Sequence, residues 1–168
     1  MNIFVLSISP KQSAIYHGDK HVIKMLLEAC QMLYTAHWVC NPLKVEEAPF
    51  AKNGKRGYKS AHLNHPCTKW VRETRGNYMW TAALAIALAD EYEYRWPGRV
   101  HACREHAVWL KANIPANLTM GQTPFAIAMD PEFRVEGNAI SSYRKYYIQS
   151  KSAKGLTVYT RRNIPKFL

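Results

Sequence analysis

A narrow polar stripe on an otherwise apolar helix is the feature that most constrains how this chain can fold. Four side chains, spaced by three, four and three residues, share one line on a helix: His21, Lys24, Glu28 and Gln31. The positions between them, within residues 22–33, are nearly all apolar. A solvent-exposed helix normally has a broad polar face and a narrower apolar one. The reversed proportions predict a mostly buried helix whose titratable side chains line a site.

Lys24 and Glu28 are the pair in this stripe that could carry chemistry. A lysine that is partly desolvated beside a basic neighbour such as His21 holds its proton less tightly. A neutral amine can attack an electrophilic carbon, and a nearby carboxylate can carry the proton. We therefore assign Lys24 as a candidate nucleophile and Glu28 as a candidate proton carrier. The alternative is a Lys–Glu pair, one helical turn apart, on a solvent-exposed face.

His17, Asp19 and His21 form a second cluster, with the pattern H-x-D-x-H. The two histidines have a spacing that could bind a metal, and His62, His65 and Cys67 are further possible ligands. However, no recognised zinc signature such as H-E-x-x-H is present, and Asp19 is equally well explained as a helix cap. We keep the three residues as candidate catalytic groups and expect neither a metal nor another cofactor.

The charge of the chain favours an anionic partner. Its 168 residues include 23 Lys and Arg against 12 Asp and Glu, a net charge of +11. Such an excess is typical of proteins that bind nucleic acid. Four cysteines without a C-x-x-C pair indicate free thiols, and hence a cytoplasmic protein. The start lacks the basic region of a signal peptide, and the longest apolar run, residues 82–89, is too short to span a membrane.

The pattern of the chain predicts one domain over residues 1–168, mainly α, as a compact helical bundle. Helices are expected from Pro10, through the stripe, from Pro66 with a break or kink at Gly76–Asn77, over residues 100–113 and over residues 138–151. Residues 82–89 are the expected core helix. Residues 41–63 and 114–137 are expected to be loops. Residues 2–7 and 156–160 are rich in strand-forming side chains, and a small β-strand pair formed by the termini is expected.

Two segments combine cations with aromatic rings, HPCTKWVRETRGNY at residues 65–78 and SSYRKYY at residues 141–147. Basic side chains suit phosphate groups, and flat rings can stack on unpaired bases. The alternative is that the rings belong to the core and the charges to a solvated face. With two polar residues of the stripe helix, these segments supply the candidate nucleic-acid-binding residues: Lys20, Gln31, His65, Lys69, Trp70, Arg72, Arg75, Tyr78, Tyr143, Arg144, Lys145 and Tyr146.

The run HGDKHVIKMLLEACQML, followed by these two segments, is similar to a family of small phage proteins. More distantly, the order of the parts resembles the pyrimidine-dimer DNA glycosylases of the phage endonuclease V type. That resemblance implies a compact helical protein with glycosylase and lyase activity. It also implies that the N-terminal α-amino group attacks the sugar C1′, that an imine forms, and that a helical glutamate assists.

Two departures separate this sequence from that family pattern. Asn2 is too large for routine removal of the initiator methionine, so we expect Met1 to be retained. The arginine–glutamate pair expected on the first catalytic helix is replaced by Ile23 and Lys24. The Lys24–Glu28 mechanism is therefore a hypothesis from the stripe and not from the resemblance.

The sequence as a whole predicts a DNA-acting enzyme of phage type, either a glycosylase and lyase or a base-modifying enzyme. Such an enzyme takes its target base out of the stack, which requires phosphate contacts around a polar pocket. We expect double-stranded DNA as the partner, no membrane association, and a monomer in the cytoplasm of an infected host cell. A non-catalytic nucleic-acid-binding protein is one alternative, and a nucleotide-dependent or metal-dependent enzyme is another.

Overall fold

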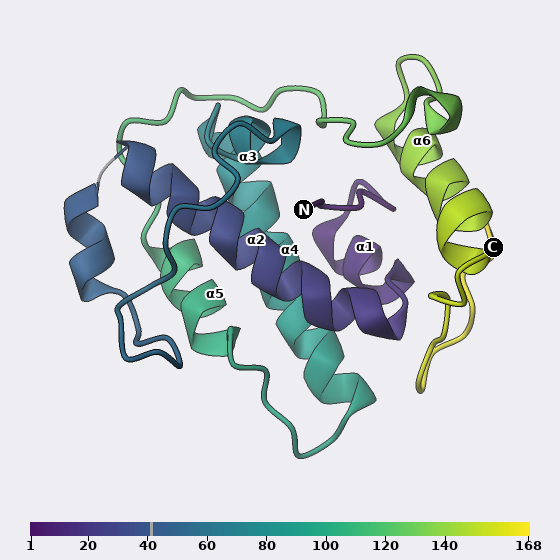
Figure 1. Ribbon diagram of the computed structural model, residues 1–168, viewed down its shortest axis with the longest axis horizontal. Coiled ribbons are helices and arrows are strands. Elements are labelled where there is room, and N and C mark those ends of the chain that lie inside the picture. The colour runs from purple at the N-terminus through teal and green to yellow at the C-terminus, as the bar shows by residue number, and fades with distance from the viewer. Residues whose placement is uncertain (41) are drawn as a thin grey trace.

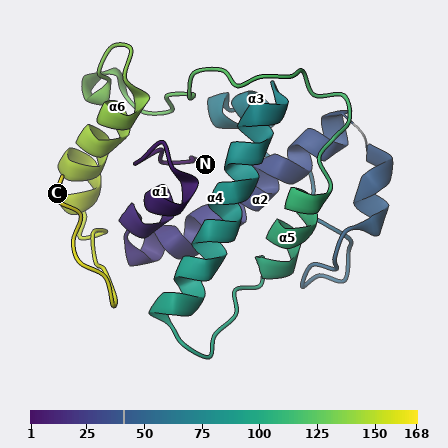
Figure 2. The ribbon, with the colours of Figure 1, turned by 180° about the vertical axis from the view of Figure 1, so that it is seen from behind.

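Two long helices, α2 (Asp19–Cys40) and α4 (Arg75–Arg95), cross at the centre of the molecule (Figure 1). This architecture comes from a computed structural model that describes residues 1–40 and 42–168, without the side chains of residues 42–44. The short helix α1 (Pro10–Tyr16) and α5 (Arg104–Ala112) both pack against α4, as the reverse view shows (Figure 2). The helix α3 (Pro66–Val71) and the 3₁₀ turn η1 (Pro42–Glu47) pack against α2. The expectation of a mainly helical protein is confirmed.

Local capping explains where these helices begin. Ser9 accepts a hydrogen bond from the Gln12 N–H at the start of α1, and His65 does the same for Cys67 at the start of α3. Each cap is followed by a proline, which lacks the N–H that a first turn leaves unpaired. Thr74 caps α4 through the Asn77 N–H. The helix is therefore interrupted at residues 72–74 and restarts at Arg75, slightly earlier than the expected break at Gly76–Asn77.

Gly76 is required by packing and not by a break in the helix. The helix continues through Gly76, whose N–H donates to the carbonyl oxygen of Gly121 at 2.8 Å. A Cβ atom at Gly76 would lie 2.4 Å from that oxygen. A glycine here allows the long connection between α5 and α6 to lie directly on α4.

Residues 82–89 form the central part of α4, and their prediction as the core helix is confirmed. Leu84, Ala85 and Leu88 have no exposed surface. Helix α2 packs against α4, and its Leu26, Met32 and Leu33 are equally buried, although Ile23 and Leu27 are exposed. Burial of a large apolar side chain contributes roughly 1.5–3 kcal/mol, so this interface is a main source of stability.

The expected β-strand pair of the termini is not formed by the described residues. Residues 3–6 are buried without being a strand, and Phe4 has a φ of +36°. Their backbone groups are bound by side chains, because Ser13 accepts from the Leu6 N–H and donates to the carbonyl oxygen of Phe4. The carbonyl oxygen of Val158 in the C-terminal segment instead accepts from the Asp19 N–H at the start of α2. The backbone groups of the two terminal segments are therefore hydrogen-bonded to a side chain or to the start of a helix.

The C-terminal part lies beside the N-terminal segment (Figure 1). After the 3₁₀ turn η2 (Pro131–Phe133), the helix α6 (Ala139–Tyr146) continues into a π-helical turn, η3 (Tyr147–Ser152). The final segment is held by buried ion pairs. Arg95 binds Asp19 at 2.9 Å and Glu91 at 2.7 Å, and Arg162 binds Glu91 at 2.8 Å. Among the described helices, none has the length and apolar character needed to cross a membrane.

Candidate active site

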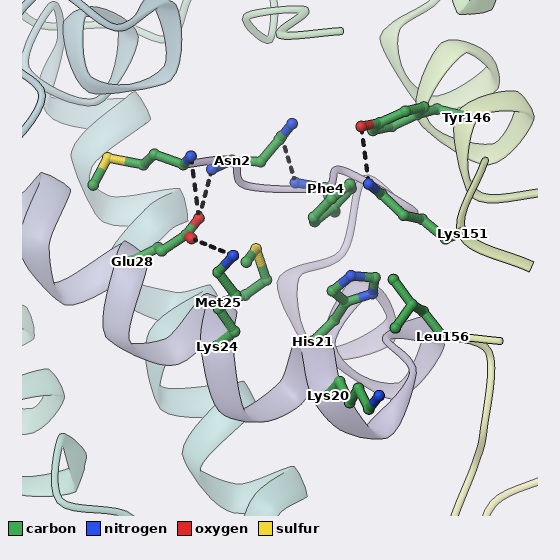
Figure 3. A pocket seen from close by; sticks show the side chains of 11 residues that line it. Asn2, Phe4, Lys20, His21, Lys24, Met25, Glu28, Tyr146, Lys151 and Leu156 are labelled. Carbon is green, nitrogen blue, oxygen red and sulfur yellow. Dashed lines mark hydrogen bonds and ion pairs between the residues drawn. The ribbon is translucent and has the colours of Figure 1, made fainter. Parts of the chain in front are cut away.

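A cavity of about 340 Å³ opens where the N-terminal segment, α2 and the C-terminal helical part meet (Figure 3). It combines three parts of the sequence, and its lining includes three lysines and one glutamate. The lining residues are Met1, Asn2 and Phe4 from the N-terminal segment, Lys20, His21, Lys24, Met25 and Glu28 from α2, and Tyr146, Lys151 and Leu156 from the C-terminal part.

Glu28 is the central polar group of this pocket. Only 7% of the residue is exposed, and its Oε2 accepts a hydrogen bond of 2.7 Å from the Asn2 N–H. The α-amino nitrogen of Met1 lies 3.8 Å from the same oxygen, and the Lys24 Nζ lies 3.7 Å from Oε1. A buried carboxylate is costly unless paired and hydrogen-bonded, and these nitrogens supply both conditions. Figure 3 shows Glu28 pointing from α2 toward the start of the chain.

The four residues of the stripe have different environments. His21 and Glu28 are buried, whereas Gln31 is partly exposed and does not line the pocket. The Lys24 side chain is 68% exposed, so the desolvation on which its role as a nucleophile depended is absent. The structure thus brings Lys24 and Glu28 together but places Lys24 at the solvent side of the pair.

His21 lines the pocket with a tyrosine behind it. Its Nδ1 lies 2.5 Å from the Tyr147 hydroxyl, which also accepts the Gly18 N–H at 2.9 Å. We assign the hydroxyl proton to Nδ1, which places the proton of the neutral ring on Nε2. Burial lowers the pKa of His21 to about 4, and the cations Lys151 and Lys24 act in the same direction. At neutral pH the ring is therefore an uncharged hydrogen-bonding group.

The other two members of the H-x-D-x-H cluster serve the fold. His17 is fully buried, donates from Nδ1 to the carbonyl oxygen of Ser13 at 2.7 Å, and has a pKa lowered to about 3 by burial. Asp19 binds Arg95 and accepts from the Thr160 hydroxyl at 2.7 Å. The cluster is therefore divided among separate partners. No three His, Cys, Asp or Glu residues in the described part of the chain are grouped so that they could bind a metal ion.

Lys20 and Tyr146 are the expected nucleic-acid-binding residues that the pocket includes. Lys151 also lines the pocket, although it is not among the residues predicted from the sequence. Its Nζ donates to the Tyr146 hydroxyl at 2.9 Å and lies 4.3 Å from the centre of the Tyr146 ring. Lys151 follows Tyr146 by five residues, a spacing that the π-helical turn η3 brings together and that an α-helical pattern does not predict. Met1, Asn2 and Phe4 also had no signal in the sequence, because only the fold brings them to Glu28.

Three of the aromatic candidates lie in the core. Trp70, Tyr78 and Tyr143 are all buried, and each donates a hydrogen bond to a backbone carbonyl oxygen. Rings held in this way are not free to stack on a base. The structure therefore favours the alternative given above for these rings, and we do not include them in the proposed site.

The remaining candidates lie outside the pocket. His65 caps α3, and Arg72 donates to the carbonyl oxygen of Leu63 at 2.8 Å. Two others brace the C-terminal part, since Arg144 donates to the carbonyl oxygen of Leu6 and Lys145 to that of Glu132. Lys69 is exposed and Arg75 is partly exposed. None of these six residues lines the cavity.

A family model for pyrimidine dimer DNA glycosylases matches residues 1–103, which is more than half of the chain. The chain belongs to the pyrimidine dimer DNA glycosylase family. The matched part contains the N-terminal segment and α1 to α4, and hence Glu28 with its nitrogen partners. The wall formed by Tyr146 and Lys151 lies beyond it. Neither the curated proteins nor the solved structures gave a match.

Membership of this glycosylase family changes the interpretation of Glu28. The family pattern predicts a glutamate near Ile23 and Lys24, and the stripe predicts Glu28 only as the partner of Lys24. The structure places Glu28 against the α-amino nitrogen of Met1 and the Asn2 N–H. An α-amino group beside a helical glutamate is the arrangement that the resemblance to these glycosylases implied.

Proposed function

We propose that this protein is a DNA glycosylase with lyase activity that acts on pyrimidine dimers in double-stranded DNA. The observation that carries the proposal is the contact of Glu28 with the first two backbone nitrogens of the chain, at 3.8 and 2.7 Å. A nucleophilic amine and a carboxylate within reach of its protons are the two groups that such a reaction requires.

In the proposed reaction the neutral α-amine attacks C1′ of the damaged nucleotide. The nitrogen lone pair forms the N–C1′ bond, and the bond from C1′ to the base breaks with its electron pair going to the base, which takes up a proton. Glu28 accepts the proton that the amine loses. Glu28 returns that proton to O4′ as the C1′–O4′ bond breaks, which opens the sugar ring and gives the imine. Loss of a proton from C2′ to Glu28 then breaks the C3′–O bond, so that the 3′ phosphate leaves and the strand is cleaved.

The α-amine at the chain start is a better candidate than Lys24. If Met1 is retained, as the size of Asn2 suggests, its nitrogen is the nucleophile at 3.8 Å from Glu28. If Met1 is removed, the Asn2 nitrogen becomes the α-amine and already lies at 2.7 Å. The Lys24 side chain is 68% exposed and lies at the rim, where a positive charge suits a phosphate group.

The rest of the pocket fits a nucleotide substrate. Lys20, Lys24 and Lys151 come from two sides of the cavity and can contact phosphates that flank the reacting sugar. His21 is neutral and can donate a hydrogen bond from Nε2 without adding charge.

Borohydride trapping tests this proposal. Wild-type protein mixed with ultraviolet-irradiated duplex DNA and borohydride is expected to give a covalent protein–DNA adduct, because reduction fixes the imine. Loss of the proton acceptor in Glu28→Gln should slow adduct formation by at least about 100-fold, the usual contribution of a general base. Lys24→Ala is the matched variant, and it should still form the adduct. Absence of any wild-type adduct would sink the imine mechanism.

The same assay separates the other functions that the sequence allows. A non-catalytic DNA-binding protein would leave irradiated DNA intact, and Glu28→Gln would change its affinity alone. A base-modifying enzyme would alter the base without cleaving the strand.

A further inference from the structure

Residues 49–59 form a tight basic hairpin that the proposed reaction does not use. The Ala51 N–H donates to the carbonyl oxygen of Lys55 at 2.8 Å, and the Gly57 N–H to that of Pro49 at 2.9 Å. Phe50 and Arg56 pair as an antiparallel bridge. Gly54 has a φ of +74° between them, which a glycine adopts without strain. The hairpin thus has its own fixed backbone.

The hairpin is also fixed to the rest of the molecule. The carbonyl oxygen of Tyr58 accepts from the Trp38 indole N–H of α2 at 2.8 Å, and its hydroxyl lies 3.2 Å from the Cys103 Sγ that precedes α5. Arg56 donates to the carbonyl oxygen of Ala48 and lies over the ring of Phe50. Arg56 therefore braces the base of the hairpin.

Three other cations of the hairpin have no such structural partners. Lys52, Lys55 and Lys59 are exposed, and none of them takes part in the ion pairs that the described residues form. The nearest acids in sequence, Glu46 and Glu47, are exposed in η1. Three unpaired lysines on a rigid backbone form a preorganised binding surface for an anion.

A groove of about 490 Å³ lies between this hairpin, α2 and residues 101–103. Lys52 and Tyr58 line it on the hairpin side, and Ile23, Lys24 and Leu27 line it on α2. Lys24 also lines the pocket that contains Glu28. The groove and the pocket are therefore neighbours that share one cation, with α2 lying between the hairpin and α6 in Figure 1.

We propose that residues 49–59 are a second phosphate clamp, which binds the backbone of the same DNA duplex that enters the active pocket. The duplex backbone passes from the pocket over Lys24 to Lys52, Lys55 and Lys59. Regularly spaced phosphates of a stiff duplex suit separate cations held at fixed positions on one face. The choice of DNA rests on the proposed function, whereas the position of the clamp rests on the groove and the hairpin contacts.

The salt dependence of DNA binding tests this clamp. Affinity of full-length protein for undamaged duplex DNA would be measured from 50 to 200 mM salt for wild type and Lys52→Ala/Lys55→Ala. Each lost phosphate contact lowers the slope of log K against log salt by about 0.9, so the double variant should lose about 1.8. Across this salt range the loss of affinity should then be about 12-fold smaller than in the wild type.

The matched control is Lys11→Ala/Lys111→Ala, which removes two exposed lysines that border a different cavity, together with Asp90. Its slope should stay close to that of the wild type. If the slope of the hairpin variant equals that of the wild type, or differs from it no more than the slope of the control does, the proposal of a second phosphate clamp is wrong. That result is distinct from failure of the proposed function, which would show as a missing adduct in borohydride trapping whatever the slope.

Discussion

At the scale of single residues, burial decides which titratable groups are available for chemistry. His17 and His21 look alike in the sequence, yet one is enclosed by the fold and the other lines the pocket. Lys24 and Glu28 are neighbours on one helix, but the lysine is exposed and the carboxylate is buried. Helical spacing predicts that Lys24 and Glu28 lie together, and their charged groups are 3.7 Å apart. The contacts of Glu28 with Met1 and Asn2 are long-range and are not encoded in that spacing.

Protonation of His17 should make stability depend on pH. Its pKa is about 3 when folded, against 6.5 as the ordinary value, so the unfolded chain binds its proton first as pH falls. The contribution of neutral His17 to the free energy of unfolding is fully present above pH 6.5 and is lost progressively below it, by about 2 kcal/mol at pH 5.

The measurement is the free energy of unfolding by urea at pH 7.5 and pH 5, for wild type and His17→Asn. The variant can still donate to the Ser13 carbonyl oxygen, so it should lose less stability on acidification than the wild type. Equal losses in both proteins would show that His17 does not account for the effect.

At the scale of elements, local rules predicted most helix starts. The Ser9–Pro10 and His65–Pro66 pairs mark the beginnings of α1 and α3, and the apolar run within α4 marks the core. The rules failed where tertiary contacts decide the outcome. Gly76 suggested a break but is a point of close packing, and residues 2–7 have strand-forming side chains but satisfy their backbone groups through Ser13 and neighbouring helices. The sequence pattern also could not decide whether Trp70 and Tyr78 are buried in the core or exposed to a ligand.

Gly76→Ala should destabilise the protein despite the higher helix propensity of alanine. The added Cβ would lie 2.4 Å from the backbone oxygen of Gly121, which cannot rotate away as a side chain could. Overpacking of this kind costs about 1–3 kcal/mol. Thermal unfolding checks the prediction, with Met79→Ala at a half-exposed position of the same helix as the control. A variant as stable as the wild type would contradict the close packing of residue 121 on α4.

At the scale of the whole molecule, buried ion pairs join the C-terminal segment to α2 and α4. Arg95 has no exposed side-chain surface and links Asp19 with Glu91, which also holds Arg162. The same C-terminal part supplies Tyr146 and Lys151 to the pocket that contains Glu28. The pocket therefore depends on a network that lies outside it.

Arg95→Met should be strongly destabilising. It leaves the largely buried Asp19 and Glu91 carboxylates without their shared partner, and breaking a buried ion pair costs about 3–5 kcal/mol. Arg104→Ala, which removes an exposed pairing with Asp90 and Glu93, should cost at most about 1 kcal/mol. Urea unfolding measures both variants, and similar costs in the two would show that the Arg95 network is not a main structural support.

The central claim is that the α-amine beside Glu28 is the nucleophile. Peptide mass spectrometry of the borohydride-trapped adduct, together with the intact mass of the free protein, locates the modified nitrogen directly. The account predicts that the sugar remnant is attached to the first residue of the mature chain, whether that residue is Met1 or Asn2. Attachment to Lys24, or to any other lysine side chain, would contradict it.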